Sequence, residues 1–232
     1  MDDDLGRMVD AIAMGRKIYV NLKKAIQYII SIHIPIILTV FIPLALNWKY
    51  PSIFTPIHII FLELIMGPTC SIIYENEPIE KNLMYQKPRP FTTTFFNLRE
   101  LTTSILQGLM ITSGTLFIYL FAVQSGYSES LSRTMVFTTL ISANIFLTLV
   151  NRSFIYSILT TATYKNNLIS IVIALTILLT ASLLFFPPFT RFFLFESIPL
   201  PELGISIATG FASVIWYEGV KWVKRSKTVS AT

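Results

Sequence analysis

Charge and cysteine are both scarce in this chain. Asp, Glu, Lys and Arg make up only 13% of its 232 residues, whereas apolar residues make up 53% and the mean hydropathy is +0.63. Soluble domains carry about 25% charged residues. The composition therefore excludes an ordinary water-soluble fold and indicates a lipid bilayer as the solvent. The single cysteine, Cys70, excludes an internal disulfide.

Soluble catalytic motifs are also absent. The sequence has no GxxxxGK[ST] loop, no zinc-ligand spacing, and no Ser-His-Asp or Cys-His arrangement in a soluble segment.

The opening MDDDLGRMVD lacks the apolar core of a signal peptide, so we expect the N-terminus to stay in the cytoplasm. The net charge of +5 comes from basic residues that flank apolar runs, which argues against a nucleic-acid partner.

Six apolar stretches are long enough to cross a bilayer as helices, which takes about 20 residues. They cover 25–46, 55–74, 101–123, 131–150, 167–186 and 203–223. Before them, apolar residues recur at helical spacing: Leu5, Met8, Val9, Ile12, Tyr19 and Leu22. The predicted fold is an all-α membrane protein with three parts: a cytoplasmic stalk helix (1–24), a six-helix transmembrane bundle (25–224) and a cytoplasmic tail (225–232).

The distribution of the basic residues predicts how the bundle is oriented in the membrane. With the N-terminus inside, fifteen Lys and Arg lie on the cytoplasmic side, and only Lys49, Arg133 and Arg191 lie outside. This positive-inside bias places both termini in the cytoplasm and the chain, as a multi-pass protein, in the plasma (inner) membrane. The short connection NWKYPS makes the first two spans an antiparallel hairpin.

Two ionisable side chains are predicted near the middle of the bilayer. Glu63 lies about eight residues inside the outer end of its span, roughly 12 Å into a hydrocarbon layer of about 30 Å. His33 reaches a similar depth from the inner end of the first span, and the hairpin favours their contact. Ionisable groups at this depth normally mark an ion or proton site. The alternative is a purely structural hydrogen bond between Glu63 and His33.

A helix break is predicted one turn after Glu63. Pro68 has no N–H, which frees the carbonyl of Leu64, and Gly67 eases local unwinding. Four residues share one face when counted by helical turns: Glu63, Gly67, Cys70 and Tyr74. The carboxylate and the freed carbonyl would then line one cavity as cation ligands, as in the broken helices of transporters. A proline kink that only shapes packing is the alternative.

Other polar or helix-breaking residues lie within the spans. Pro35 predicts a second broken helix, in the first span, and Asn144 is a candidate cation ligand in the fourth. For Asn144, interhelical hydrogen bonding is an equal alternative. Gly108 is expected to allow close helix packing, Glu218 to lie at the inner interface, and His58 to lie near the outer surface without a role.

The segments DDDLGRMVDAIAMGRKIYVNLKKAIQYIISIHIPI, PIHIIFLELIMGPTCSIIYENEP and KNLMYQKPRP together resemble the C-terminal membrane region of P-type cation-transporting ATPases, especially bacterial calcium-ATPase-like pumps. The likeness is specific over 2–90 and weaker beyond. It implies that the six spans are the fifth to tenth of ten helices. It also implies that Glu63 occupies a sixth-helix ligand position, which is asparagine in animal calcium pumps. His33 would replace a fifth-helix asparagine, and Asn144 would match an eighth-helix asparagine ligand.

The chain departs from the family pattern at three carboxylate positions. Ile36, Ile141 and Gly67 stand where the family has glutamate, glutamate and aspartate. Because Ca²⁺ favours several carboxylate oxygens, the cation stays open between Ca²⁺, another cation and a proton.

The family's catalytic motifs do not occur in these residues. DKTGT, TGE and GDGxND are absent, so this chain alone is expected not to hydrolyse ATP, and Mg-ATP would act only through other domains of the pump. The predicted function is the ion-binding membrane part of an ATP-driven pump, with lipid, the cation and the rest of the pump as partners. The alternatives are a stand-alone channel or proton-coupled carrier, and a non-transporting partner subunit of a split pump.

Overall fold

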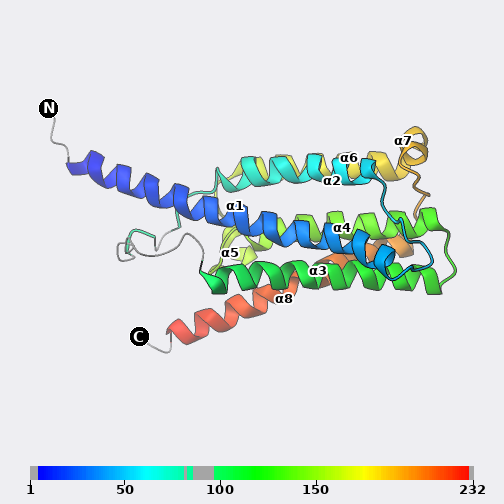
Figure 1. The fold of residues 1–232 in the computed structure, drawn as a ribbon. Helices are drawn as coiled ribbons and strands as arrows, with labels where there is room; N and C mark the ends of the chain where they lie inside the picture. Colours follow the sequence, from blue (N-terminus) through cyan, green and yellow to red (C-terminus); the bar gives the residue numbers. More distant parts are fainter. Residues whose placement is uncertain (1–4, 81–82, 86–96, 230–232) are drawn as a thin grey trace.

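The computed structural model describes residues 5–80, 83–85 and 97–229 (Figure 1). The first four residues of the predicted stalk, the basic residues Lys81, Lys87 and Arg89 that were assigned to the cytoplasmic side, and the last three residues of the predicted tail lie outside this part. The helical elements are α1 (Leu5–Ala45), α2 (Pro56–Pro68), η1 (Thr69–Tyr74), α3 (Leu98–Gln124), α4 (Glu129–Val150), α5 (Ile158–Ala162), α6 (Asn167–Phe185), α7 (Pro187–Phe192) and α8 (Leu200–Val229).

Six helical segments in the described residues are long and apolar enough to cross a membrane. They coincide with the six predicted spans, and α2 and η1 together form the second. The all-α, multi-pass prediction is therefore confirmed. Two short helices were not predicted: α5 lies in the connection between the fourth and fifth spans, and α7 lies in the loop rich in Phe and Pro that follows α6.

Helix α1 continues without a break from the predicted stalk into the first span. Its N-terminal part projects beyond the other helices (Figure 1) and exposes apolar side chains, including Met8, Val9 and Ile12. The prediction that Pro35 breaks this helix is wrong, because α1 extends to Ala45. Neighbouring helices help a membrane helix to tolerate proline.

The contact between α1 and α3 explains how Pro35 is accommodated. Pro35 has no N–H to donate to the carbonyl of Ser31. That carbonyl lies against Gly108 of α3, where an added Cβ would lie 3.0 Å from the Ser31 oxygen and 2.8 Å from Ile34 Cβ. A glycine Cα–H can interact weakly with a carbonyl at such a close approach. The predicted role of Gly108 in close packing is therefore confirmed.

Helix α4 lies at the centre of the bundle, where it packs against α1, α3, α6 and α8. It is buried along most of its length although it carries many hydroxyl groups. Several of these donate to carbonyls four residues earlier in the same helix, as Thr138 does to Thr134 and Thr139 does to Met135. The polar groups of α4 are thus largely satisfied locally, which allows a hydroxyl-rich helix to be buried.

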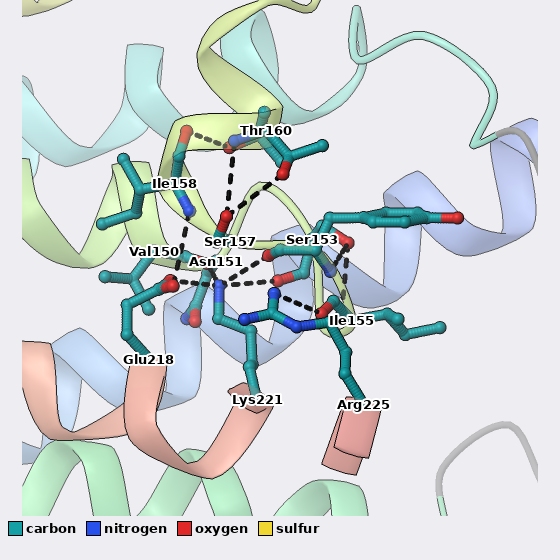
Figure 2. A network of polar contacts seen from close by, with 12 residues as sticks. Val150, Asn151, Ser153, Ile155, Ser157, Ile158, Thr160, Glu218, Lys221 and Arg225 are labelled. Carbon is teal, nitrogen blue, oxygen red and sulfur yellow. Dashed lines mark hydrogen bonds and ion pairs between the residues drawn. The ribbon is translucent and has the colours of Figure 1, made fainter. Parts of the chain in front are cut away.

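The C-terminal end of α4 is capped by a lysine from α8 (Figure 2). Lys221 is fully buried, and its Nζ lies 2.8 Å from the Val150 carbonyl oxygen, 3.2 Å from that of Ser153 and 3.0 Å from that of Tyr156. Glu218 supplies a carboxylate oxygen 2.5 Å from the same nitrogen. Because the last carbonyls of a helix lack helical donors and attract cations, this ammonium ties α8 to α4.

We expect Gly210→Ala to destabilise the bundle. An added Cβ at Gly210 on α8 would lie 2.8 Å from Ser142 Cβ and 2.8 Å from the Thr139 carbonyl oxygen of α4. The helices would have to separate, at a cost of about 1–3 kcal/mol. Thermal unfolding of the purified protein in detergent measures the change. Gly204→Ala, on the same helix with nothing within 4 Å of the new Cβ, is the control; equal melting temperatures for the two variants would contradict the close contact.

Lys221→Met should also lower the melting temperature. The substitution keeps the apolar stem but leaves three carbonyls and the Glu218 carboxylate without their cation. Breaking a buried charge interaction costs about 3–5 kcal/mol. Lys224→Met is the matched control, because Lys224 is half-buried and lies 5.5 Å from the Tyr217 ring. A loss for Lys221→Met no larger than that of the control would refute the capping role.

Candidate functional site

The hairpin of α1 and α2 brings the two ionisable side chains of the membrane interior together. His33 Nε2 on α1 lies 3.1 Å from Glu63 Oε1 on α2. The contact expected from the short hairpin and the matching depths is therefore present in the structure.

The hydrogen bond on the other side of the imidazole fixes its orientation. His33 Nδ1 lies 2.8 Å from the carbonyl oxygen of Ile29, one turn earlier on α1. Because a carbonyl only accepts, Nδ1 is the donor and carries a proton. A neutral His33 then turns the Nε2 lone pair toward the Glu63 carboxylate, which also only accepts when ionised. The distance of 3.1 Å between His33 Nε2 and Glu63 Oε1 is favourable only when a proton or a cation lies between these two atoms.

The pair lies on an exposed face of the hairpin. The side chain of His33 is 38% exposed and that of Glu63 is 46% exposed. The neighbours on this face are apolar and also exposed, among them Ile37, Ile60 and Leu64. Ionisable groups at the predicted depth almost always face the bundle interior or a water-filled cavity, so we expect this face to be covered by protein or by water that protein holds.

The chain stays helical through Gly67 and Pro68, and it changes its winding directly after them. Helix α2 ends at Pro68 and continues as the π-helix η1, so the predicted local unwinding does not occur. Pro68 nevertheless deprives the Leu64 carbonyl of its α-helical donor, and the amide of Thr69 donates to Met66. Single π-helical turns within α-helices are frequent at functional sites.

The π-helix also changes the direction in which side chains at the end of this span point. Tyr74 is fully buried, whereas Glu63 and Gly67 are exposed. The prediction that these residues share one face is therefore wrong for Tyr74, because a π-helix takes more residues per turn than the spacing assumed. The side chain of Cys70, which was placed on the same face, lies outside the described part.

Asn144 lies in the packed interior of the bundle. It is 2% exposed, and its Oδ1 accepts a hydrogen bond of 2.5 Å from the Tyr28 hydroxyl of α1. Its Nδ2 has no hydrogen-bond partner in the described part of the chain. Asn144 therefore takes part in interhelical hydrogen bonding, the alternative raised by the sequence, and it does not share the exposed face of Glu63.

Two buried ion pairs join the segment that follows η1 to the rest of the bundle, one from α1 and one from the chain directly after α4. Lys24 Nζ on α1 lies 2.7 Å from Glu80 Oε1, and Arg152 Nε lies 3.0 Å from Glu77 Oε1. Asn21 on α1 adds a hydrogen bond of 2.8 Å to the Glu77 carbonyl. The sequence analysis assigned no role to these residues. The one signal was the acidic run YENEP directly after an apolar span, because carboxylates so placed need partners.

Tyr164, in the connection between α5 and α6, lies beside this group of charges. The Arg152 guanidinium carbon is 5.7 Å from the centre of the Tyr164 ring. Burial, and then the negative charge of Glu80, raises the pKa of Tyr164 to about 12. The phenol therefore stays neutral at physiological pH and adds no charge to the ion pairs of Arg152 and Glu80.

His58, the other histidine, is held in place by hydrogen bonds and aromatic packing. It is fully buried, its Nε2 lies 2.7 Å from the Phe193 carbonyl oxygen, and its Nδ1 accepts from the amide of Thr55 at 3.0 Å. The rings of Phe137 and Phe195 pack against it. Sequence position alone did not reveal this burial, because it arises where α2, α4 and the segment after α7 meet.

A cavity of about 320 Å³ lies elsewhere, between α4, α6 and α8, and its lining is almost entirely apolar. None of the four predicted ligand residues lines it. The described residues also contain no group of three or more His, Cys, Asp or Glu side chains arranged to hold a metal. A cation at His33 and Glu63 would therefore need further ligands from backbone carbonyls, from water or from other parts of a larger protein.

Comparisons with known proteins agree with this architecture. A family model described as "Cation transporting ATPase, C-terminus" matches residues 51–223. The chain is similar to Calcium-transporting ATPase 1 of Schizosaccharomyces pombe, with 24% identity over 100% of this chain and 26% of that protein. It is also similar to a calcium-transporting ATPase of Listeria monocytogenes, with 26% identity over 96% of this chain and 25% of that protein.

A human relative, Calcium-transporting ATPase type 2C member 1, is 24% identical over 98% of this chain and 24% of its own length. The chain thus spans about a quarter of the length of the curated relatives it matches. The family model covers most of the chain, and the structure supplies the six membrane-spanning helices. The chain therefore belongs to the family of cation-transporting ATPase C-terminal regions, the membrane part of the P-type cation pumps.

Proposed function

We propose that this chain binds the transported cation for an ATP-driven P-type pump of the plasma (inner) membrane, with both termini in the cytoplasm. The observation that carries the proposal is the contact of 3.1 Å between His33 and Glu63 near the middle of the bilayer. The relatives are named as calcium-transporting ATPases, which supports Ca²⁺ or a related cation as the transported ion.

The cation site is formed first by the Glu63 carboxylate and the His33 imidazole. The Leu64 carbonyl, without its α-helical donor because of Pro68, is the next oxygen on the same helix. Asn144 becomes a ligand only after its present hydrogen bond has been broken. Its Oδ1 holds the Tyr28 hydroxyl, which would have to turn away before that oxygen could bind a cation.

The rest of the pump covers the exposed face of the hairpin. The relatives are about four times as long as this chain, so they contain further segments able to shield Glu63 and His33 from lipid. Mg-ATP acts through those segments, because the phosphorylation motif DKTGT does not occur here. The exposure of two ionisable groups at this depth supports such a partner more directly than it supports a stand-alone channel.

The stalk part of α1 carries the coupling between ATP hydrolysis and the cation site. His33 and Lys24 lie on one continuous helix, and the Lys24–Glu80 pair joins that helix to the segment after η1. Movement of the stalk would therefore reach both sides of the hairpin. Reciprocal coupling requires one element whose position both the ATP-hydrolysing site and the cation site influence. Helix α1 meets this requirement because it runs continuously from the stalk into the first span.

Glu63→Gln in the complete pump should reduce apparent cation affinity on the order of 10- to 100-fold, because the amide removes the only carboxylate of the pair. Cation-dependent formation of the phosphoenzyme from labelled ATP is the measurement. Glu129→Gln is the matched control, because Glu129 pairs with Arg133 at the start of α4, away from the hairpin face. Unchanged cation affinity in Glu63→Gln would show that this glutamate is structural.

A further inference from the structure

We propose that the chain binds a phospholipid from the leaflet at the α7 end of the bundle, with one acyl chain in an apolar groove and the phosphate at Arg191. The apolar groove is the cavity of about 320 Å³ between α4, α6 and α8. None of the residues proposed as cation ligands lines it. The lipid site is therefore separate from the cation site, and it does not depend on which ion the pump carries.

The apolar groove offers hydrocarbon, and not polar atoms, to an occupant. Thr138 lines the groove but donates its hydroxyl to the Thr134 carbonyl. Ser142 lines it too, and donates to the Ile207 carbonyl. The hydroxyl oxygen of Thr180 is covered, although it has no hydrogen-bond partner in the described part of the chain. Because a bound water needs about two to four polar partners, the groove suits an apolar molecule and not water or an ion.

The apolar groove opens away from the bundle. Three of its lining residues are apolar and exposed: Ile177 and Phe185 on α6, and Ile207 on α8. Both helices are long and apolar enough to span the membrane, so their exposed side chains meet lipid wherever no other protein covers them. A groove left empty beside lipid would lose dispersion contacts. A lipid acyl chain, which is as apolar as a leucine side chain, would restore those contacts.

The size of the apolar groove favours an acyl chain over a protein helix. One helical turn, 5.4 Å long and about 10 Å across with its side chains, occupies roughly 400 Å³. The groove measures about 320 Å³, near the lower end of the range of about 300–1,000 Å³ for small-molecule pockets. A helix of another protein can therefore only cover the groove, whereas one acyl chain can enter it.

A basic residue lies near one end of the apolar groove. Helix α7 folds back onto the end of α6, where the Thr190 hydroxyl donates to the Leu183 carbonyl at 2.9 Å. Leu184, next to Leu183, lines the groove, and Arg191, next to Thr190, is exposed. No carboxylate in the described part of the chain forms an ion pair with Arg191. Its guanidinium is therefore available to an external anion.

The position of α7 identifies that anion as a lipid phosphate. Helix α7 lies at the end of the bundle away from the N-terminal part of α1 and the C-terminal part of α8 (Figure 1). Phe189 and Phe192 of α7 are exposed, as is Phe186 just before it, which is typical of a helix at the surface of the hydrocarbon layer.

The phosphate provides the selectivity of the site. An acyl chain gains little when it leaves lipid for the apolar groove, because both surroundings are hydrocarbon. A guanidinium, in contrast, binds phosphate oxygens through paired, charge-assisted hydrogen bonds, which are stronger than those between neutral groups. A phospholipid should therefore occupy the groove in preference to an apolar lipid without a phosphate.

The test uses the complete pump that contains this chain, in nanodiscs with a phosphatidylglycerol that carries a photoreactive diazirine in one acyl chain. Mass spectrometry of the digested pump locates the lipid adducts. We expect adducts on Ile145 and Phe146, which line the groove from α4. Unlabelled phosphatidylglycerol should suppress these adducts roughly fivefold better than the same concentration of diacylglycerol with the same chains, because only the former offers a phosphate to Arg191.

Two substitutions test the two parts of the site. Ala181→Phe places a ring in the groove and should reduce the α4 adducts roughly fivefold or more, because a phenyl ring fills space that the acyl chain needs. Ala174→Phe is the matched control, since Ala174 is exposed on the same helix outside the groove lining. Arg191→Gln, at an exposed position, should keep the melting temperature and remove the advantage of phosphatidylglycerol over diacylglycerol.

The outcomes decide each part separately. Unchanged α4 adducts in Ala181→Phe would show that the lipid lies outside the groove. Equal competition by the two lipids in the wild-type pump, or an unchanged advantage of phosphatidylglycerol in Arg191→Gln, would refute the role of Arg191. Adducts on α6 without any on α4 would show that another segment covers the groove, which also overturns the proposal. Because Arg191→Gln leaves the helix packing intact, it remains decisive even if Ala181→Phe does not fold.

Discussion

The free-energy cost of exposing an ionisable side chain to hydrocarbon is the constraint on which this arrangement depends. The chain satisfies it within its own fold for Lys24, Glu77 and Arg152, which are buried and paired. It leaves the constraint unsatisfied for His33 and Glu63, which contact each other but remain exposed at a depth predicted to lie near the middle of the bilayer. This contrast supports the proposal that the pair serves a ligand and is covered by other segments, because a purely structural pair would be enclosed as the others are.

The most extensive helix packing in the described part of the chain lies away from the pair. Helix α4 forms the centre, α8 approaches it closely at Gly210, and the Lys221 ammonium joins the same two helices at the C-terminal end of α4. The second span lies nearer the periphery (Figure 1) and changes from α- to π-helix after Pro68. A stable bundle therefore supports a hairpin whose second helix has weakened local hydrogen bonding where the cation site is proposed.

Much of this organisation could be predicted from the sequence because the bilayer imposes simple rules. Span length follows from membrane thickness, and the contact of His33 with Glu63 follows from a short hairpin and two equal depths. The continuity of α1 through Pro35 could not be predicted, because it depends on Gly108 of a distant helix. The burial of Tyr74 depends on a π-helix, and the capping by Lys221 depends on carbonyls about 70 residues earlier in the chain; neither leaves a periodic signal.

A cryo-electron microscopy map of the complete pump, prepared with Ca²⁺ under conditions that stabilise the cation-loaded state, tests the central claim most directly. We expect density for one ion between His33 Nε2 and Glu63 Oε1, with both atoms at bonding distance and the exposed face of the hairpin covered by other helices of the pump. An ion bound elsewhere, with His33 and Glu63 still in direct contact, would contradict the assignment of this pair as the cation site.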